Sequence, residues 1–232
     1  MASELVIGCD DDLVELPVFA VHTVLFPGAS MGLRVFEPRY LALMDEVLPA
    51  GAFAMVAIRH GREVGGGYEP YRAGVTVTIE AHTLHNDGTH LLRVRGRDRV
   101  ALITPVSQEP YPVWQAEPFP DEGGAGTDDV EAAIAELGRY LAATGNATET
   151  LAPSQGHDQG HELPTAPHDP VAASYVLAAA TPGLVPQHQA LLETPGAGER
   201  LREVRATFRR EAALMRALGA GVGGAATDVS PN

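Results

Sequence analysis

The sequence predicts an α+β fold, with a small β-barrel or sandwich first and helices after it. Short segments rich in β-branched residues recur in the first half, as in VTVTIEAHTL ahead of the Asn86-Asp87-Gly88 turn. The segment PFPDEGGAGT, residues 118–127, then has no apolar periodicity and reads as a boundary. Beyond it, apolar residues recur at the spacing of helical faces.

Composition narrows the class of protein. A chain of 232 residues with 45% hydrophobic content forms one sizeable domain or two small ones. Its formal net charge of −14 opposes a partner held through phosphate groups, so nucleic acid is not an expected partner.

The types of residue that are missing exclude some chemistry. All 16 basic residues are arginine, which excludes a P-loop and a Ser-Lys catalytic dyad in their usual forms. The single cysteine, Cys9, has no partner for an intramolecular disulfide. No apolar run reaches the roughly 18 residues of a membrane span, and no secretory signal opens the chain, so we expect a cytoplasmic protein.

The most distinctive stretch is residues 16–48. Even spacing of apolar residues from Val18 to Phe26 predicts a strand, and Phe26-Pro27-Gly28 predicts a turn into a second strand. A helix is then expected to begin at Pro38, because proline suits the first helical position.

Further strands are expected between residues 51 and 118. GAFAMVAIR, residues 51–59, reads as a buried strand, and residues 62–74, with four glycines and a proline, read as a loop. Residues 75–84 and 90–94 form the arms of the hairpin. Gly96 is expected to break the second arm before another strand at residues 100–106.

The second half predicts helices. The first starts at Asp128 with a capping-box spacing to Glu131. The polar residues 147–168 are expected to form a mobile loop, and Asp169-Pro170 restarts a helix. A short helix at residues 186–193 and a long one at 197–218 follow. The first helix has an apolar stripe formed by Val130, Ile134, Leu137 and Leu141.

Four stretches together resemble a known family. They are LPVFAVHTVLFPG, LRVFEPRYLALM, GTHLLRVRGRDRVALI and ALLETPGAGERLREVRATFRREAALM. They are similar to the Lon protease N-terminal, substrate-binding domain, and most of all to the small bacterial proteins that carry that domain alone. The resemblance covers about residues 16–218 and implies a PUA-like β-barrel with no catalytic residues, since the ATPase and protease domains are absent.

The resulting domain plan has four parts. We expect an acidic leader at 1–12, a β-rich PUA-like module at 13–120, a helical subdomain at 127–219 that includes the 147–168 loop, and a disordered tail at 220–232.

The expected function is non-catalytic binding of polypeptides. Clients would be unfolded or degron-bearing chains, held in an apolar groove between barrel and helices or added as a strand to a sheet edge, with an ATPase or protease as a further partner. No cofactor is expected. The candidate peptide-binding residues are Phe36, Tyr40, Tyr68, Tyr71 and Trp114. The residues assigned a structural role in the family motifs are Phe26, Pro27, Gly28, Glu37, Pro38, Arg39, Gly96 and Arg99.

Two other classes of function stay open at this point. PUA-like barrels bind RNA in other proteins, and alternating arginines at 93, 95, 97 and 99 would line one strand face if the strand ran unbroken. A small hydrolase is the second alternative, although no serine has a GxSxG context.

Histidines give weaker hypotheses for a metal site. The first group lies in the polar loop and the second flanks the hairpin, and neither has a cysteine nearby. The two groups are His157, His161 and His168, and His82, His85 and His90. Ordinary solvated histidines are the preferred interpretation, so no metal is expected.

Overall fold

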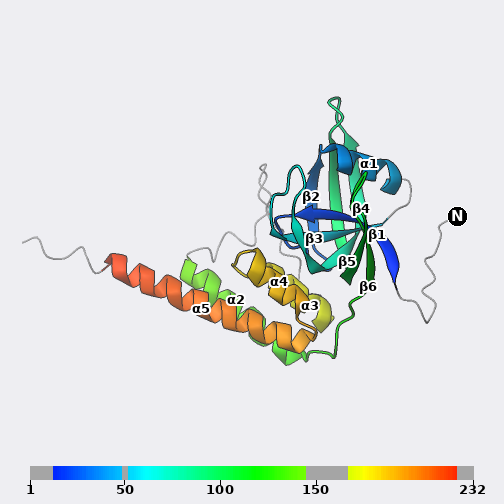
Figure 1. Cartoon of the computed structure of the whole chain (residues 1–232). Coiled ribbons are helices and arrows are strands. Elements are labelled where there is room, and N and C mark those ends of the chain that lie inside the picture. Colours follow the sequence, from blue (N-terminus) through cyan, green and yellow to red (C-terminus); the bar gives the residue numbers. More distant parts are fainter. Residues whose placement is uncertain (1–12, 49–51, 145–166, 224–232) are drawn as a thin grey trace, which may run out of the picture. The chain divides into compact units, whose positions relative to one another are not determined.

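The computed structural model describes residues 13–48, 52–144 and 167–223 (Figure 1). The predicted leader, residues 147–166 of the predicted loop and residues 224–232 of the predicted tail lie outside these ranges. The strands are β1 (Val14–Val21), β2 (Ser30–Val35), β3 (Phe53–His60), β4 (Glu69–Leu84), β5 (His90–Ser107) and β6 (Val113–Pro118). The helices are α1 (Pro38–Val47), α2 (Thr127–Thr144), α3 (Pro170–Ala179), α4 (Val185–Glu193) and α5 (Ala197–Gly223).

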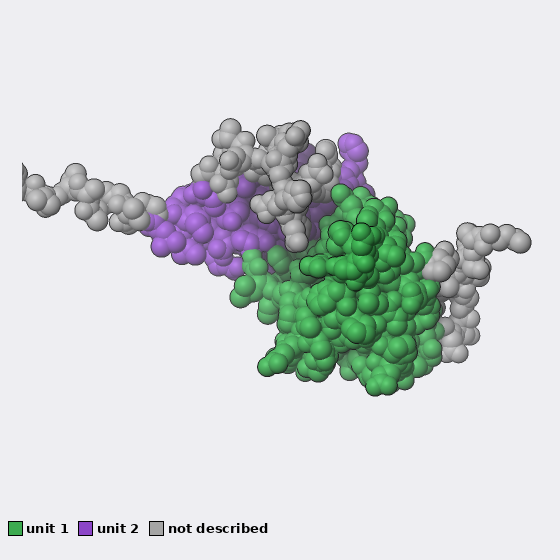
Figure 2. Space-filling model, turned by 90° about the horizontal axis from the view of Figure 1, so that it is seen from above, with its two compact units in different colours: residues 1–122, 183–195 green, residues 123–182, 196–232 purple. Residues whose placement is uncertain are grey.

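The chain forms two compact units, coloured separately in Figure 2. Unit 1 comprises residues 1–122 and 183–195, and unit 2 comprises residues 123–182 and 196–232. The sequence predicts that the short helix near residue 186 belongs to the helical half. In the structure this helix, α4, belongs with the β-rich unit, because it packs on β3 and β4.

The six strands form one mixed sheet that closes into a ring. The strand order is β2-β5-β4-β3-β1-β6, and β5 also pairs with β6. The N-terminal half of β5 pairs with β2, whereas its C-terminal half pairs with β6. The long β5 therefore closes the barrel and carries β2 as a side branch, which confirms the predicted α+β class.

β1 and β3 pair in parallel, and both are buried on their two faces. One face lies inside the ring, where Val18, Val56 and Trp114 belong to one apolar cluster. The opposite face meets α1, where Phe19 stacks on Tyr40 with ring centroids 4.1 Å apart. Burial on both faces explains the nearly continuous apolar runs of these strands.

Two strands are longer than predicted. β4 begins at Glu69, so the prediction of a loop through Gly74 was wrong for residues 69–74. Pro70 lies between two register shifts of the β3–β4 pair, where a missing N–H is tolerated. β5 runs unbroken through Gly96, so the predicted break there was also wrong. The hairpin that joins β4 and β5 projects beyond the other strands (Figure 1).

Unit 2 consists of α2, α3 and α5. The side chains of Leu201, Val204 and Phe208 on α5 are buried, and the Phe208 ring centre lies 5.7 Å from the ring centre of Tyr140 on α2. The predicted stripe on α2 was partly wrong, because Ile134 is 42% exposed and Glu136 is buried instead. Glu136 is held by Arg139 and Arg209, each 2.8 Å from its carboxylate, which offsets the cost of burying a charge.

Helix ends follow their predicted chemistry in one case and not in another. Asp169 caps α3 by accepting from the backbone N–H groups of Val171 and Ala172, as the sequence predicted. At α2 the capping carboxylate is Asp129, which accepts from the Gly126 N–H, in place of the predicted Asp128. α5 continues to Gly223 and so occupies the predicted start of the tail.

A membrane span would need a longer apolar run than any helix in the described part of the chain contains.

Candidate functional site

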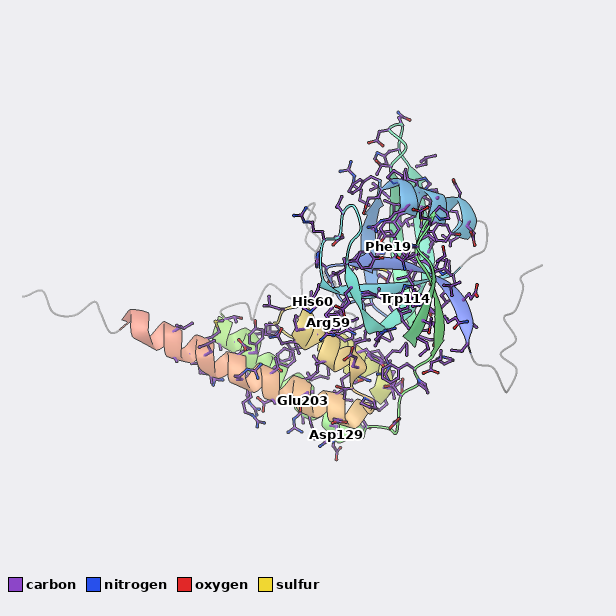
Figure 3. All side chains as sticks on the ribbon, viewed as in Figure 1. Phe19, Arg59, His60, Trp114, Asp129 and Glu203 are labelled. Atoms are coloured by element: carbon purple, nitrogen blue, oxygen red, sulfur yellow. The ribbon has the colours of Figure 1, made fainter. Side chains whose placement is uncertain are left out.

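A groove of about 630 Å³ opens in unit 1, at the end of the barrel where β3 finishes and β4 begins. Arg59 and His60 mark this end in Figure 3, whereas Phe19 lies away from it, on the face of β1 that meets α1. Two arginines, two glutamates and several apolar side chains line it. The lining residues are Arg59, Glu69, Pro70, Tyr71, Arg72, Ala73, Ala101, Phe119 and Glu193. A concave surface of this size, with a mixed apolar and charged lining, is in the volume range of ligand-binding pockets.

Arg72 is fixed in place on the strand that forms one wall. Its Nη1 donates to the carbonyl oxygens of Leu102 at 3.3 Å and Ile103 at 2.6 Å. Its guanidinium also lies 5.1 Å from the centre of the Trp114 ring. The two carbonyls and the indole ring hold the Arg72 side chain in one conformation before any ligand binds. Binding a ligand therefore costs less side-chain entropy.

The other charged groups of the groove have partners. Arg59 pairs with Glu69 at 3.5 Å, and both side chains are more than half exposed, so this pair is weak. Glu193, at the end of α4, accepts from the Gln189 side chain at 2.8 Å. The same Gln189 amide donates to the Ala73 carbonyl at 2.9 Å, so it fastens α4 to the groove wall on β4.

Arg99 supports the part of the groove lining that lies outside the strands. Its buried guanidinium donates to the carbonyls of Leu192, Thr194 and Pro120 at 2.7 to 2.9 Å and pairs with Asp121 at 3.4 Å. It also lies 4.2 Å from the centre of the Phe119 ring. One arginine therefore gathers the end of α4 and the chain after β6, the two segments that supply Glu193 and Phe119.

The predicted peptide-binding residues separate in the structure. Tyr71 lines the groove, and Trp114 lies beneath Arg72 but is only 8% exposed. Tyr40 is buried against Phe19, and its hydroxyl accepts from the Ala20 N–H. Phe36 is 51% exposed at the end of β2 and does not line the groove. The structure thus brings only Tyr71, of these residues, into the groove itself.

The Glu37-Pro38-Arg39 motif fixes a corner of unit 1. Arg39 pairs with Glu37 at 3.2 Å and donates to the Glu63 carbonyl. Its guanidinium lies over the rings of Tyr40 and Tyr68, and Tyr68 is the remaining predicted peptide-binding residue. Glu37 also accepts from the N–H of Gly65, so the pair fastens the glycine-rich segment after β3. Burial raises the pKa of both tyrosines above their ordinary value, which keeps these hydroxyls neutral.

The turn Phe26-Pro27-Gly28 and Gly96 belong to one feature. The Gly28 N–H donates to the Gly96 carbonyl and the Gly96 N–H donates to the Ala29 carbonyl, both at 2.9 Å. A Cβ on Gly96 would lie 2.4 Å from the Phe26 carbonyl oxygen. Gly96 therefore lets β5 pass directly beneath the turn.

The arginine row of β5 is not a uniform basic face. Arg93 and Arg95 both pair with Glu80, at 3.4 and 2.5 Å, and Arg99 is buried. The hydrogen bond from Arg95 lowers the pKa of Glu80, which keeps that carboxylate ionised between the two arginines. Only Arg97 of the row remains both exposed and without a carboxylate partner among the described residues.

The described serines and the hairpin histidines were candidates for a hydrolase and for a metal site. The hydroxyls of Ser30, Ser107 and Ser174 bond to Glu80, the Glu109 carbonyl and the Val171 carbonyl, and none of these partners is a catalytic base for a triad. His82 and His90 stack and share a hydrogen bond of 3.0 Å. No group of three metal-ligating side chains occurs in the described ranges, and His157 and His161 lie outside them.

Most residues of the groove were not predicted from the sequence. Arg72 falls in the segment predicted as a loop, and Phe119 falls in the predicted boundary. Gln189 and Glu193 were assigned to the helical half. The one available signal was an aromatic residue between two prolines, Pro118-Phe119-Pro120, which is unusual in a solvated linker.

The ATP-dependent protease La (LON) substrate-binding domain matches residues 15–207. The chain belongs to this family. This confirms the resemblance found in the sequence. No protein among the curated ones compared with this chain matches it.

Two solved structures of Lon N-terminal domains share the fold. The Lon N-terminal domain protein from Xanthomonas campestris is 26% identical, with a TM-score of 0.58, over 83% of this chain and 98% of that chain. The N-terminal domain of the Mycobacterium avium complex Lon protease is 20% identical, with a TM-score of 0.60, over 84% and 98%. At that lower identity the second likeness shows the fold alone.

Proposed function

We propose that this Lon substrate-binding-type chain binds segments of polypeptide in the groove of unit 1. The observation that carries the proposal is the lining of this groove, in which Tyr71, Pro70 and Phe119 supply apolar surface beside charged groups with fixed positions. Membership of a substrate-binding family supports the same class of ligand. Unfolded or degron-bearing chains are the clients that expose such segments.

The protein acts, in this proposal, as a recognition or adaptor module and not as an enzyme. It holds a client for an ATPase or protease partner in the cytoplasm and takes no cofactor. The pairing of Arg93 and Arg95 with Glu80, together with the net charge of −14, favours this reading over RNA binding.

The test is a titration of the full chain with a labelled, blocked peptide that contains an aromatic and aliphatic run. We expect saturable binding followed by fluorescence anisotropy, and Tyr71→Ala should weaken it about tenfold, as loss of a buried aromatic contact does. Absence of saturable binding up to high micromolar peptide would reject the proposal.

Phe36→Ala is the matched control, since it removes an aromatic that is exposed elsewhere in unit 1. Within the described residues, the neighbouring β2 pairs with β5 alone, so its second edge is the alternative place for an added strand. If Phe36→Ala weakens binding and Tyr71→Ala does not, the binding surface lies at that edge instead of the groove.

A further inference from the structure

Arg72 lines the groove and keeps one edge of its guanidinium out of its own hydrogen bonds. All the hydrogen bonds that hold it use Nη1, and within the described ranges Nε and Nη2 make none. The Nε and Nη2 edge of a guanidinium is one of the two faces that bind a carboxylate through two parallel hydrogen bonds. The anchoring of this side chain therefore leaves a complete carboxylate-binding fork open.

The ion pairs of the groove point to the same residue. Arg59 already pairs with Glu69, and Glu193 already accepts from Gln189. Among the residues that the structure describes, no carboxylate forms an ion pair with Arg72. The chain has a net charge of −14, yet this cation has a fixed position in the groove and no carboxylate partner. An anionic group of a ligand would supply the missing partner.

The apolar lining limits which anions fit. Pro70, Tyr71 and Phe119 line the same groove as Arg72, so an anion alone would leave their apolar surface in contact with water. A ligand that covers them and reaches Arg72 needs an apolar side chain next to a carboxylate.

We propose that Arg72 binds a carboxylate of the client, so that the groove selects polypeptide segments in which an acidic group lies beside an apolar side chain. The inference rests on the proposed polypeptide-binding function and specifies its client. The carboxylate comes from an aspartate or glutamate side chain or from the C-terminus of the client, since both offer the same two oxygens to the fork.

The experiment uses the full chain and three peptides that share one apolar run. The first has a glutamate beside the run and blocked ends. The second replaces that glutamate with glutamine, and the third is the glutamine peptide ended at this position with a free C-terminal carboxylate. Trp114 is the single tryptophan of the chain and lies beneath Arg72, so its emission reports occupancy of this part of the groove.

We expect the glutamate peptide, the free-carboxylate peptide or both to bind at least about tenfold more tightly than the blocked glutamine peptide. The stronger of the two identifies the source of the carboxylate. Equal affinities for all three peptides would overturn the carboxylate inference while leaving polypeptide binding in place. Failure of all three to bind would overturn the proposed function and this inference with it.

Variants of the protein supply the second arm. Arg72→Gln should abolish the preference for the carboxylate peptides, whereas Arg97→Gln, which removes an exposed arginine outside the groove, should keep it. Arg72→Lys should retain only part of the preference, because an ammonium lacks the two-pronged geometry. A preference unchanged in Arg72→Gln would assign the carboxylate to another residue and refute the proposal.

Discussion

At the scale of single residues, Gly28 and Gly96 are needed for different reasons. Gly28 has a φ of +79° with no atom within 4 Å of a would-be Cβ, so its requirement is conformational. Gly96 has an ordinary φ, but a Cβ there would meet the Phe26 carbonyl. Gly28→Ala should therefore cost about 1 to 2 kcal/mol, from the left-handed backbone alone.

Gly96→Ala should cost more, about 3 kcal/mol, because two backbone segments that are hydrogen-bonded to each other must move apart. Urea denaturation of both variants, followed by Trp114 emission, gives the two free energies of unfolding. Equal costs would contradict this role of Gly96, because they would mean that the turn can move away from β5 without loss of stability.

Arg99 is the second residue whose role can be tested alone. Arg99→Met should destabilise unit 1 by about 3 kcal/mol, because the carbonyls of Leu192, Thr194 and Pro120 would lose their shared donor. Peptide affinity should fall as well, since Phe119 and Glu193 lose their support. Arg97→Met, an exposed neighbour on β5, is the control and should change the free energy of unfolding by less than about 0.5 kcal/mol.

At the scale of elements, α2 and α5 are joined through the buried carboxylate of Glu136. Hydrogen bonding from Arg209, and then from Arg139, holds the pKa of Glu136 below its ordinary value of 4.5. A carboxyl group with a lower pKa in the folded state stabilises the fold above its unfolded pKa. This contribution is lost as the pH falls through the folded pKa.

Glu136→Gln should therefore lower the free energy of unfolding by about 1 to 2 kcal/mol at neutral pH. The gap between variant and wild type should narrow as the pH falls below 4.5, the ordinary pKa of the group. Denaturation followed by far-UV circular dichroism over this range measures the gap. Glu131→Gln, an exposed acid on the same helix, serves as the control, and a gap that is constant with pH would contradict the assigned role.

Element types were predictable from the sequence, whereas some of their ends were not. β-branched runs and helical stripes carry local information, and every predicted helix and the hairpin are present. The two errors on strands share one cause. Gly74 and Gly96 read as breaks, yet a Cβ at Gly74 would lie 2.4 Å from the Met55 carbonyl and one at Gly96 would meet Phe26. A glycine demanded by a distant backbone cannot be distinguished in sequence from one that ends a strand.

The groove was predictable only at Tyr71. Its other residues come from the rest of β4 and from β3, β5, the chain after β6 and α4, and no local pattern connects the segments that lie far apart in sequence. Arg99 was assigned a structural role through the family resemblance. The carbonyls that it binds lie more than 90 residues away in two cases, at Leu192 and Thr194, and follow only from the fold.

At the scale of the whole molecule, the chain enters unit 2 at Gly123, returns to unit 1 for residues 183–195 and re-enters unit 2 at Gly196. The returning segment carries α4, whose Gln189 side chain is 1% exposed and bonded to Ala73 of β4. By sequence order α4 is flanked by helices of unit 2. Its hydrogen bonds, however, attach α4 to the groove of unit 1. We therefore expect α4 to unfold locally together with β4 and not with α3 or α5.

Gln189→Ala tests this expectation in the full chain. The variant loses the bonds to Ala73 and Glu193, so amide hydrogen exchange in α4 and in the adjoining part of β4 should rise about tenfold. Exchange in α2, α3 and α5 should stay at the wild-type rate. Ser174→Ala is the matched variant in unit 2, where it removes the hydroxyl that accepts from buried Arg200 at 2.6 Å, and it should raise exchange in α3 and α5 alone. If either variant raised exchange in both sets of elements equally, the two units would unfold as one and α4 would not belong to unit 1 alone.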